Sequence, residues 1–213
     1  CASARGVIGD EAAARDWLHG LPGYDRAAEV RLERLVALLA AENSVQNLVS
    51  AASLASVWRR HIADSAQLLT HVPRETAGPW LDLGTGAGFP GLVIAALRPE
   101  MSVRMVESRP RRAGWLRHVI GALDLPAAVV LENRLERIAS FAAAVISARA
   151  FAPLARLITL SARFSTAGTQ WLLPKGRSAG DELAALSRRH AFHVEQSLTD
   201  PEAGIIVGRL LDV

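Results

Sequence analysis

Apolar residues recur at helical spacing through the first third of the chain. Helices are expected over residues 10–18, 24–42 and 54–72, because apolar side chains there return every three or four positions. In the second of these segments, the apolar positions at helical spacing are Val30, Leu32, Leu35, Val36, Leu38 and Leu39. Pro73 is placed to end the third helix. We therefore predict an N-terminal helical extension that occupies residues 1–76.

From residue 77 onward, short apolar runs alternate with helical segments. The expected strands are 79–83, 102–107, 127–131, 143–148 and 169–173, and the expected helices are 89–97, 110–123, 153–164 and 179–189. Two final apolar runs, 192–197 and 205–211, are expected to pair as antiparallel strands. Alternation of strand and helix implies parallel pairing through right-handed crossovers. We predict an α/β domain over residues 77–213, with a Rossmann-like, mostly parallel sheet and an antiparallel last strand.

Composition narrows the class of protein. Of the 213 residues, 50% are hydrophobic and 21% are charged, which argues against a disordered chain. The apolar runs are shorter than the ~18 residues that a membrane-spanning helix needs. The single cysteine, Cys1, cannot form an internal disulfide, and residues 1–10 contain no apolar signal segment. A cytoplasmic protein without a membrane partner is therefore expected.

The basic residues of the chain are almost all arginines. The net charge of +3 does not by itself indicate a nucleic-acid ligand, and Lys175 is the single lysine. Arginine suits phosphate recognition and stacking on bases, because its guanidinium is planar and always charged. A genomic preference for arginine over lysine explains the same trend, so composition leaves both interpretations open.

The strongest local motif follows the first predicted strand. Asp82 precedes glycines at 84, 86, 88 and 91, at the point where an α/β fold places a ligand. Glycines allow sharp turns and a close approach of the backbone to a ligand, and the following helix start adds free N–H groups. Gly86-x-Gly88-x-x-Gly91 also matches a dinucleotide fingerprint. However, the Asp-x-Gly-x-Gly-x-Gly arrangement resembles the first motif of class I methyltransferases, in which this loop binds S-adenosylmethionine.

Two further segments extend this predicted cofactor site. Glu107 ends the second strand of the domain, where an acidic side chain accepts hydrogen bonds from ribose hydroxyls. The competing interpretation is that Glu107 only pairs with nearby arginines. Residues 133–136, Asn-Arg-Leu-Glu, follow the third strand, where such enzymes hold the adenine ring.

With these motifs in order, the chain resembles the bacterial small-subunit ribosomal RNA guanine-N7 methyltransferase family, once called glucose-inhibited division protein B. The resemblance covers residues 47–207, and its motifs occur in order along the chain. They are Asn47-Leu48-Val49-Ser50, Arg60-His61-Ile62-Ala63-Asp64-Ser65, residues 82–91, Glu107-Ser108 with Arg111-Arg112, Ser147-Ala148-Arg149-Ala150-Phe151, and Pro174-Lys175-Gly176.

The resemblance implies methylation of N7 of a guanine in the 530 loop of 16S ribosomal RNA, with S-adenosylmethionine converted to S-adenosylhomocysteine. It also implies site residues. The residues implied to contact the cofactor are Asp82, Gly84, Gly86, Gly88, Phe89, Glu107, Leu135, Glu136 and Arg149. Arg134, Arg149 and Lys175 are implied on the substrate side, as the candidates for catalysis. The chain departs from the family at Ala203-Gly204, where many members carry an Arg-His pair, and in residues 41–46, where an aromatic residue and a lysine are usual.

Other side chains are candidates for RNA binding or for positioning. Arg109, Arg111 and Arg112, with Lys175, are candidate phosphate contacts, although a solvated helix face explains the three arginines equally well. His61 and Asp64 are predicted to form a buried hydrogen-bonded pair that positions the N-terminal helices, because they lie three residues apart on one helical face; Asn47 is a third positioning candidate. No metal is expected, because no third ligand follows at a recognisable spacing.

Aromatic residues are candidates for stacking on an exposed guanine. Trp58, Trp115 and Phe151 are expected in the core, whereas Phe89, inside the glycine-rich loop, is the candidate for stacking.

Several alternatives remain open from the sequence. A nicotinamide-dependent oxidoreductase shares the sheet and part of the glycine pattern. A non-catalytic RNA-binding or ribosome-assembly factor would keep the fold without the chemistry. A methyltransferase acting on a small molecule or a protein is the third alternative. The expected partner is 16S ribosomal RNA or the small ribosomal subunit, and the chain is expected to act as a monomer.

Overall fold

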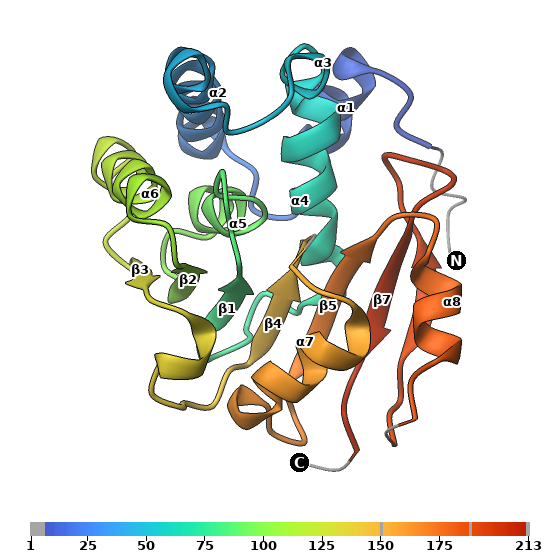
Figure 1. The fold of residues 1–213 in the computed structure, drawn as a ribbon. Helices are drawn as coiled ribbons and strands as arrows, with labels where there is room; N and C mark the ends of the chain where they lie inside the picture. The colour runs from blue at the N-terminus through green and yellow to red at the C-terminus, as the bar shows by residue number, and fades with distance from the viewer. Residues whose placement is uncertain (1–6, 150, 188, 212–213) are drawn as a thin grey trace.

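The structure, a computed structural model, describes residues 7–149, 151–187 and 189–211. Cys1, the single cysteine, and Ala150, part of the 147–151 motif, lie outside the described residues. A seven-stranded sheet forms the centre of the molecule, in the order β3-β2-β1-β4-β5-β7-β6 (Figure 1). The strands are β1 Trp80–Leu83, β2 Val103–Glu107, β3 Ala128–Glu132, β4 Val145–Ala148, β5 Gln170–Lys175, β6 His193–Gln196 and β7 Gly204–Gly208.

Strand directions agree with the prediction from the alternating pattern. The pairs β1–β2, β1–β4, β2–β3 and β4–β5 are parallel. β7 lies between β5 and β6 and is antiparallel to both. The Rossmann-like fold with an antiparallel last strand is therefore confirmed. The carboxyl ends of β1, β2 and β4 meet at one edge of the sheet, which is where the glycine-rich loop begins.

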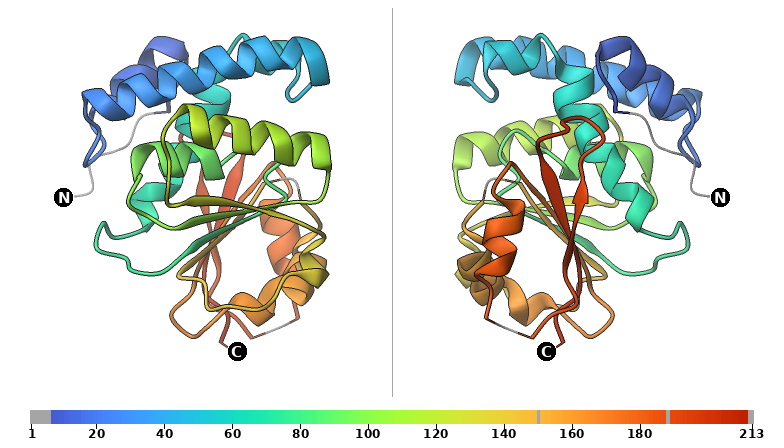
Figure 2. Two further views of the ribbon diagram at one scale, coloured as in Figure 1. Left: turned by 90° about the vertical axis from the view of Figure 1, so that its left-hand side faces the viewer. Right: turned by 90° about the vertical axis from the view of Figure 1, so that its right-hand side faces the viewer.

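Helices cover both faces of the sheet. Figure 2 shows the N-terminal helices above α5 and α6 on one face, and α7 and α8 on the other. The α-helices are α1 Glu11–His19, α2 Arg26–Gln46, α3 Ala51–Leu54, α4 Asp64–Ala66, α5 Gly91–Leu97, α6 Pro110–Ala122, α7 Leu154–Ser161 and α8 Ala179–Ala184. A π-helix, Trp58–Ala63, precedes α4, and 3-10 helices occupy Gln67–His71, Leu135–Arg137 and Ala162–Phe164. Within the described ranges, no helix has the length and apolar character required to cross a bilayer.

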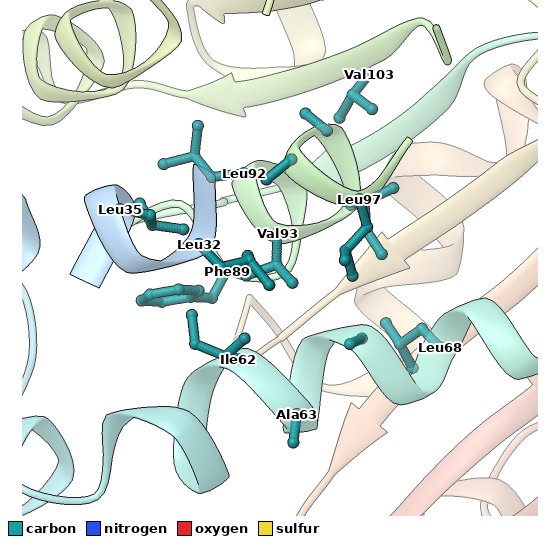
Figure 3. Close-up of a cluster of buried hydrophobic side chains, with 14 of the residues drawn as sticks. Leu32, Leu35, Ile62, Ala63, Leu68, Phe89, Leu92, Val93, Leu97 and Val103 are labelled. Atoms are coloured by element: carbon teal, nitrogen blue, oxygen red, sulfur yellow. The ribbon is translucent and has the colours of Figure 1, made fainter. Parts of the chain in front are cut away.

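The N-terminal helices share one apolar core with the sheet. Asp10 and Asp25 cap the first two helices by accepting hydrogen bonds from backbone N–H groups of Ala13 (2.8 Å) and Ala28 (2.7 Å). The shared core is shown in Figure 3, and its labelled members include Leu32 and Leu35 of α2, Ile62 of the π-helix, and Phe89, Leu92 and Val93 of the loop and α5. This packing fixes the N-terminal helices over the glycine-rich loop. The division at residue 76 stays a prediction.

Three details differ from the predicted helices. The segment expected as one helix over 54–72 is a series of short helices, and a π-helix at Trp58–Ala63 lies at its centre. Glu11 of α1 stabilises the first turn of this π-helix, because its two carboxylate oxygens accept hydrogen bonds from the backbone N–H groups of Trp58 (3.0 Å) and Arg59 (2.8 Å). The last helix ends at Ala184, earlier than expected. Val30 is 46% exposed, because Ala28, Leu32, Leu35 and Leu39 form the buried side of α2.

Candidate active site

The glycine-rich loop between β1 and α5 takes backbone conformations that only glycine adopts readily. Gly84, Gly86 and Gly88 have φ angles of 63°, 59° and 107°. A Cβ on Gly88 would lie 2.2 Å from Cδ1 of Leu92, and one on Gly84 would lie 2.4 Å from Cδ2 of Phe151. Gly84 and Gly88 are therefore required by the close packing of the loop against Phe151 and Leu92 as well as by its backbone conformation.

Asp82, in β1, fixes this loop through hydrogen bonds. Its side chain is fully buried, and its carboxylate accepts hydrogen bonds from the N–H of Gly91 (3.0 Å) and from Oγ of Ser147 (2.8 Å). The Ser147 hydroxyl accepts a further hydrogen bond from Nε1 of Trp80 (2.8 Å). Burial raises the pKa of Asp82 above its ordinary value. Asp82 thus joins the end of β1 to the start of α5 and to β4, beneath the predicted cofactor site.

Glu107, at the end of β2, holds the same loop from the side. Its carboxylate accepts hydrogen bonds from the N–H groups of Gly86 (3.1 Å) and Arg109 (2.9 Å). These contacts are to backbone, so arginine side chains are not what holds Glu107 in place. A carboxylate has about four acceptor sites, which leaves capacity for the two ribose hydroxyls. The predicted ribose contact stays a prediction that this geometry permits.

The segment after β3 lies at the same edge of the sheet, because Glu132 is in register with Glu107. It forms the 3-10 helix Leu135–Arg137, in which Leu135 is buried and Glu136 is exposed. The guanidinium of Arg163 donates a hydrogen bond to the carbonyl of Leu135. Arg134 is exposed at the start of this helix.

Arg149 joins the sheet to the N-terminal helices. Its Nη1 lies 3.3 Å from Oδ2 of Asp64 and 3.3 Å from the carbonyl oxygen of Arg60, and its Nη2 lies 3.1 Å from Nδ1 of His61. Asp64 also accepts a hydrogen bond from Oγ1 of Thr199 (2.7 Å). Among the described residues, His61 and Asp64 form no direct hydrogen bond with each other; the predicted pair is instead bridged by the guanidinium of Arg149, which contacts both side chains.

Phe89 is not available for stacking on a substrate base. It is 2% exposed, and its ring stacks on the His61 ring with 4.7 Å between centroids. The prediction that Phe89 is the stacking aromatic is therefore wrong, because the N-terminal helices cover this part of the loop. Trp58 and Trp115 are buried as expected, whereas Phe151 is half-buried beside Gly84.

Lys175 ends β5 and is held inside the protein. Its Nζ donates hydrogen bonds to Oε2 of Glu182 (2.8 Å) and to the carbonyl of Ala152 (2.9 Å), and its side chain is 9% exposed. Burial alone would raise the pKa of Glu182, but hydrogen bonds from Lys175, Ser178 and Leu154 hold it below its ordinary value. The catalytic and RNA-binding roles of Lys175 stay predictions, and the geometry shows a cation that is already paired.

A cavity of about 330 Å³ lies beside this group of residues. Arg60, His61, Asp64, Arg149 and Lys175 all line it, together with Ala203 of the β6–β7 connection and Gly204, the first residue of β7. The structure thus brings together the predicted residues of the 60–65, 147–151 and 174–176 motifs. Arg134 does not line this cavity, and Asn47 is an exposed residue at the end of α2, with a φ of 45°.

The predicted RNA-binding arginines lie at the start of α6. Arg109 and Arg111 are exposed, and Arg112 is half-buried, with its Nη1 3.4 Å from where a Cβ on Gly86 would lie. Within the part of the chain that the structure describes, none of the three forms an ion pair, whereas Arg117 lies 2.6 Å from Glu132. Among those residues, no group of three or more His, Cys, Asp or Glu side chains is arranged to hold a metal ion.

Sequence reasoning missed Ser147, Phe151 and Glu182 as site residues. Ser147 belongs to the 147–151 motif, so its place in that motif was the available signal. No sequence motif marked Glu182 as a site residue, because its pairing with Lys175 depends on how α8 and β5 are placed in the fold. Arg60 belongs to the 60–65 motif and lines the cavity, where it lies 3.4 Å from Asp200.

The fold and the loop define a class of protein. A glycine-rich loop after β1, an acidic residue at the end of β2 and an antiparallel last strand are the features of a Rossmann-like methyltransferase that uses S-adenosylmethionine. The residues fit this cofactor, because the partly exposed Gly84 and Gly86 present backbone without a side chain and Glu107 retains acceptor sites for a ribose.

The chain belongs to the rRNA small subunit methyltransferase G family, whose model matches residues 28–204. It is 60% identical over 187 residues to ribosomal RNA small subunit methyltransferase G of Erythrobacter litoralis, covering 87% of this chain and 90% of the relative. It is 58% identical over 205 residues to the protein of that name from Novosphingobium aromaticivorans, covering 94% of this chain and 89% of the relative. A methyltransferase structure from Aquifex aeolicus shares the fold, with a TM-score of 0.54 and 14% identity over 70% of this chain and 89% of that one.

Replacing His61 by asparagine is expected to flatten the dependence of stability on acid pH. Burial, with contributions from Arg149 and Arg60, lowers the pKa of His61 from 6.5 to about 3. Between these values the unfolded chain binds a proton that the folded chain does not. The stabilisation is therefore complete above the unfolded pKa and decreases as the pH falls toward the folded pKa. The wild type should lose about 2 kcal/mol more than the variant between pH 7 and pH 5.

Urea denaturation of both proteins at pH 7, 6 and 5 measures this difference. An equal loss of unfolding free energy in the two proteins would show that His61 titrates normally in the folded state.

Proposed function

We propose that this protein transfers a methyl group from S-adenosylmethionine to N7 of a guanine in the 530 loop of 16S ribosomal RNA. Family membership supports a ribosomal RNA substrate. The cofactor supplies an activated methyl group on a sulfonium, and the glycine-rich loop with Glu107 is the proposed site for it. The cavity beside Arg149 is the proposed site for the guanine.

The observation that carries this proposal is the pairing of the ionisable side chains that line the cavity. Arg60 is paired with Asp200, Arg149 with Asp64 and His61, and Lys175 with Glu182. Guanine N7 has a lone pair and no proton, so its methylation needs no general base. Such a cavity suits a reaction whose rate depends on holding the two reactants in the right orientation. Orientation of this kind lowers the activation barrier by roughly 7–11 kcal/mol in favourable cases.

The same pairing suits the charge that develops during the reaction. Methyl transfer moves positive charge from sulfur to the purine, so a free cation beside N7 would oppose it. Arg149 and Lys175 each lie against a carboxylate, at 3.3 Å and 2.8 Å. Their local fields are therefore partly neutralised, which supports roles in shaping the pocket rather than in contacting N7.

The proposed partner is the small ribosomal subunit or its 16S RNA, bound by a cytoplasmic monomer. Arg109, Arg111 and Arg112 lie at the start of α6, next to the loop, and this helix end, which has no side-chain cap, adds positive partial charge. Phosphates are the ligand that this arrangement suits. The nicotinamide-dependent alternative has no support from the family, and the complete glycine-rich loop argues against a purely structural RNA-binding factor.

Incubation with tritium-labelled S-adenosylmethionine and small subunits from cells that lack this activity tests the proposal. The expected result is one labelled guanine in the 530 loop, with the methyl group on N7. Label at another base or position would overturn the substrate assignment, and absence of label despite tight cofactor binding would direct the search to another substrate.

Neutralising the arginines at the start of α6 is expected to weaken RNA binding without affecting the cofactor. The triple variant with Arg109, Arg111 and Arg112 changed to glutamine should bind small subunits at least roughly tenfold more weakly at moderate salt, because phosphate contacts add counterion release. The slope of log affinity against log salt should fall by about one for each arginine that binds a phosphate in the wild type.

Arg117→Gln is the matched control, since it lies on the same helix but is paired with Glu132. Affinity for S-adenosylmethionine, measured by calorimetry, should stay unchanged in both variants. A triple variant that binds subunits like the control would show that these arginines form only a solvated helix face.

A further inference from the structure

The two ring nitrogens of His61 differ in their hydrogen-bond partners. Nδ1 lies 3.1 Å from Nη2 of Arg149. A guanidinium donates hydrogen bonds and cannot accept them, so Nδ1 must be the acceptor in this contact. In a neutral imidazole the proton then resides on Nε2. Within the described residues, Nε2 has no hydrogen-bond partner, and it is buried from solvent.

The surroundings hold the ring neutral and in one orientation. Burial lowers the pKa of His61 to about 3, with Arg149 and Arg60 contributing in the same direction, so the imidazole carries no charge near neutral pH. The ring stacks on Phe89 at 4.7 Å, and Asp64 holds Arg149 in place. His61 also belongs to a π-helix that Glu11 caps, a local structure often found at functional sites.

A buried donor without a partner is uncommon in folded proteins, because such a group loses its hydrogen bond to water and gains nothing in return. His61 is 7% exposed and lines the cavity between the 60–65 motif and the end of β5. Nε2 itself is closed to solvent in this arrangement, so a ligand in the cavity reaches it after a shift of neighbouring side chains, and the ligand atom that pairs with Nε2–H must be an acceptor.

We propose that the Nε2–H of His61 donates a hydrogen bond to O6 of the target guanine. This inference rests on the proposed function. O6 is the acceptor next to N7 on the same base edge, so one donor can hold the base while N7 stays free to accept the methyl group. A neutral donor adds no positive charge beside the purine as it becomes cationic. Adenine presents an amino group at this position, so the same donor selects guanine over adenine.

Two substitutions at the same position separate this role from a purely structural one. His61→Gln keeps an N–H donor near the position of Nε2 but has no acceptor at the position of Nδ1. His61→Asn keeps an acceptor for Arg149 but has no donor near Nε2. Both remove the stacking interaction with Phe89, so each is the matched control for the other. Melting temperature and affinity for S-adenosylmethionine report on folding and on the cofactor site.

The expected result is that His61→Asn loses roughly ten- to a hundredfold in kcat/KM on small subunits, while His61→Gln retains more activity than His61→Asn. Cofactor affinity should remain close to the wild-type value in both. The opposite order, with His61→Asn the more active, would overturn the proposal, because it would mean that His61 acts only by holding Arg149.

Changing the substrate tests the same hydrogen bond with the wild-type protein, so its main result does not depend on how a variant folds. The probe is a reconstituted small subunit in which the target guanine is replaced by 2-aminopurine, which keeps N7 and lacks O6. The wild-type protein should methylate it roughly ten- to a hundredfold less efficiently, and His61→Asn should show little further loss. Equal methylation of both subunits by the wild type would overturn the inference. Cofactor binding without methylation of the natural guanine would instead overturn the proposed function.

Discussion

Replacing Asp82 by alanine is expected to lower the affinity for S-adenosylmethionine by roughly a hundredfold and to destabilise the fold by about 3 kcal/mol. The carboxylate accepts hydrogen bonds from the Gly91 N–H (3.0 Å) and from the Ser147 hydroxyl (2.8 Å), and its side chain is fully buried. Alanine would leave both donors unsatisfied in a place that water does not reach. The loop that Gly91 closes would then lose its fixed shape, although Asp82 itself need not touch the cofactor.

Calorimetric titration with S-adenosylmethionine and urea denaturation measure the two effects. Ser147→Ala is the matched control, since it removes the hydrogen bonds of Ser147 with Asp82 and Trp80 and leaves the Gly91 hydrogen bond intact. We expect a loss of affinity smaller than tenfold, because only the contact with Asp82 bears on the loop and one hydrogen bond is worth about 1 kcal/mol. If Asp82→Ala bound the cofactor as tightly as Ser147→Ala does, the carboxylate would not be what shapes the loop.

The fold and the cofactor loop could be predicted because their signals are local. Glycines at 84, 86 and 88 are required by the positive φ angles of one continuous turn, and apolar runs of strand length that alternate with helices indicate a mostly parallel sheet. Each of these signals lies within a short stretch of sequence, so neighbouring residues alone are sufficient to recognise it.

The side-chain pairing in the cavity could not be predicted, because it depends on how distant elements pack. Arg149 is 88 residues from His61 and 85 from Asp64 in sequence, and no spacing rule places a guanidinium between them. The position of Phe89 in a ligand loop predicts an exposed aromatic. Phe89 is buried because helices from the N-terminal extension cover that loop, and the local pattern around it contains no sign of this cover.

Arg149 makes the N-terminal extension part of the site. It follows β4 in sequence, and it contacts His61 and Asp64 in the helical segment that precedes β1. The predicted boundary at residue 76 would therefore separate two halves of one pocket. We infer that the extension serves the substrate side, whereas the loop and Glu107 serve the cofactor.

Breaking the Lys175–Glu182 pair from either side is expected to destabilise the protein, and removing both charges is expected to restore most of the loss. Lys175→Met would leave the Ala152 carbonyl without its donor and Glu182 without its cation, and Glu182→Gln would leave a mostly buried ammonium. Each single variant should lose about 3 kcal/mol of unfolding free energy. The double variant should lose less than the sum of the two, because no uncompensated charge remains.

Methylation by the double variant then decides between two roles for Lys175. If the ammonium acts by holding Ala152 and Glu182, the folded double variant should bind S-adenosylmethionine normally and methylate small subunits within roughly tenfold of the wild type. This is the result that the 9% exposure of Lys175 favours. A stable double variant that binds cofactor but no longer binds subunits would instead place the ammonium on the RNA. In that case Glu182 would have to release it when the substrate arrives, and binding of RNA would come with a measurable rise in the pKa of Glu182, because Lys175 would no longer donate its hydrogen bond.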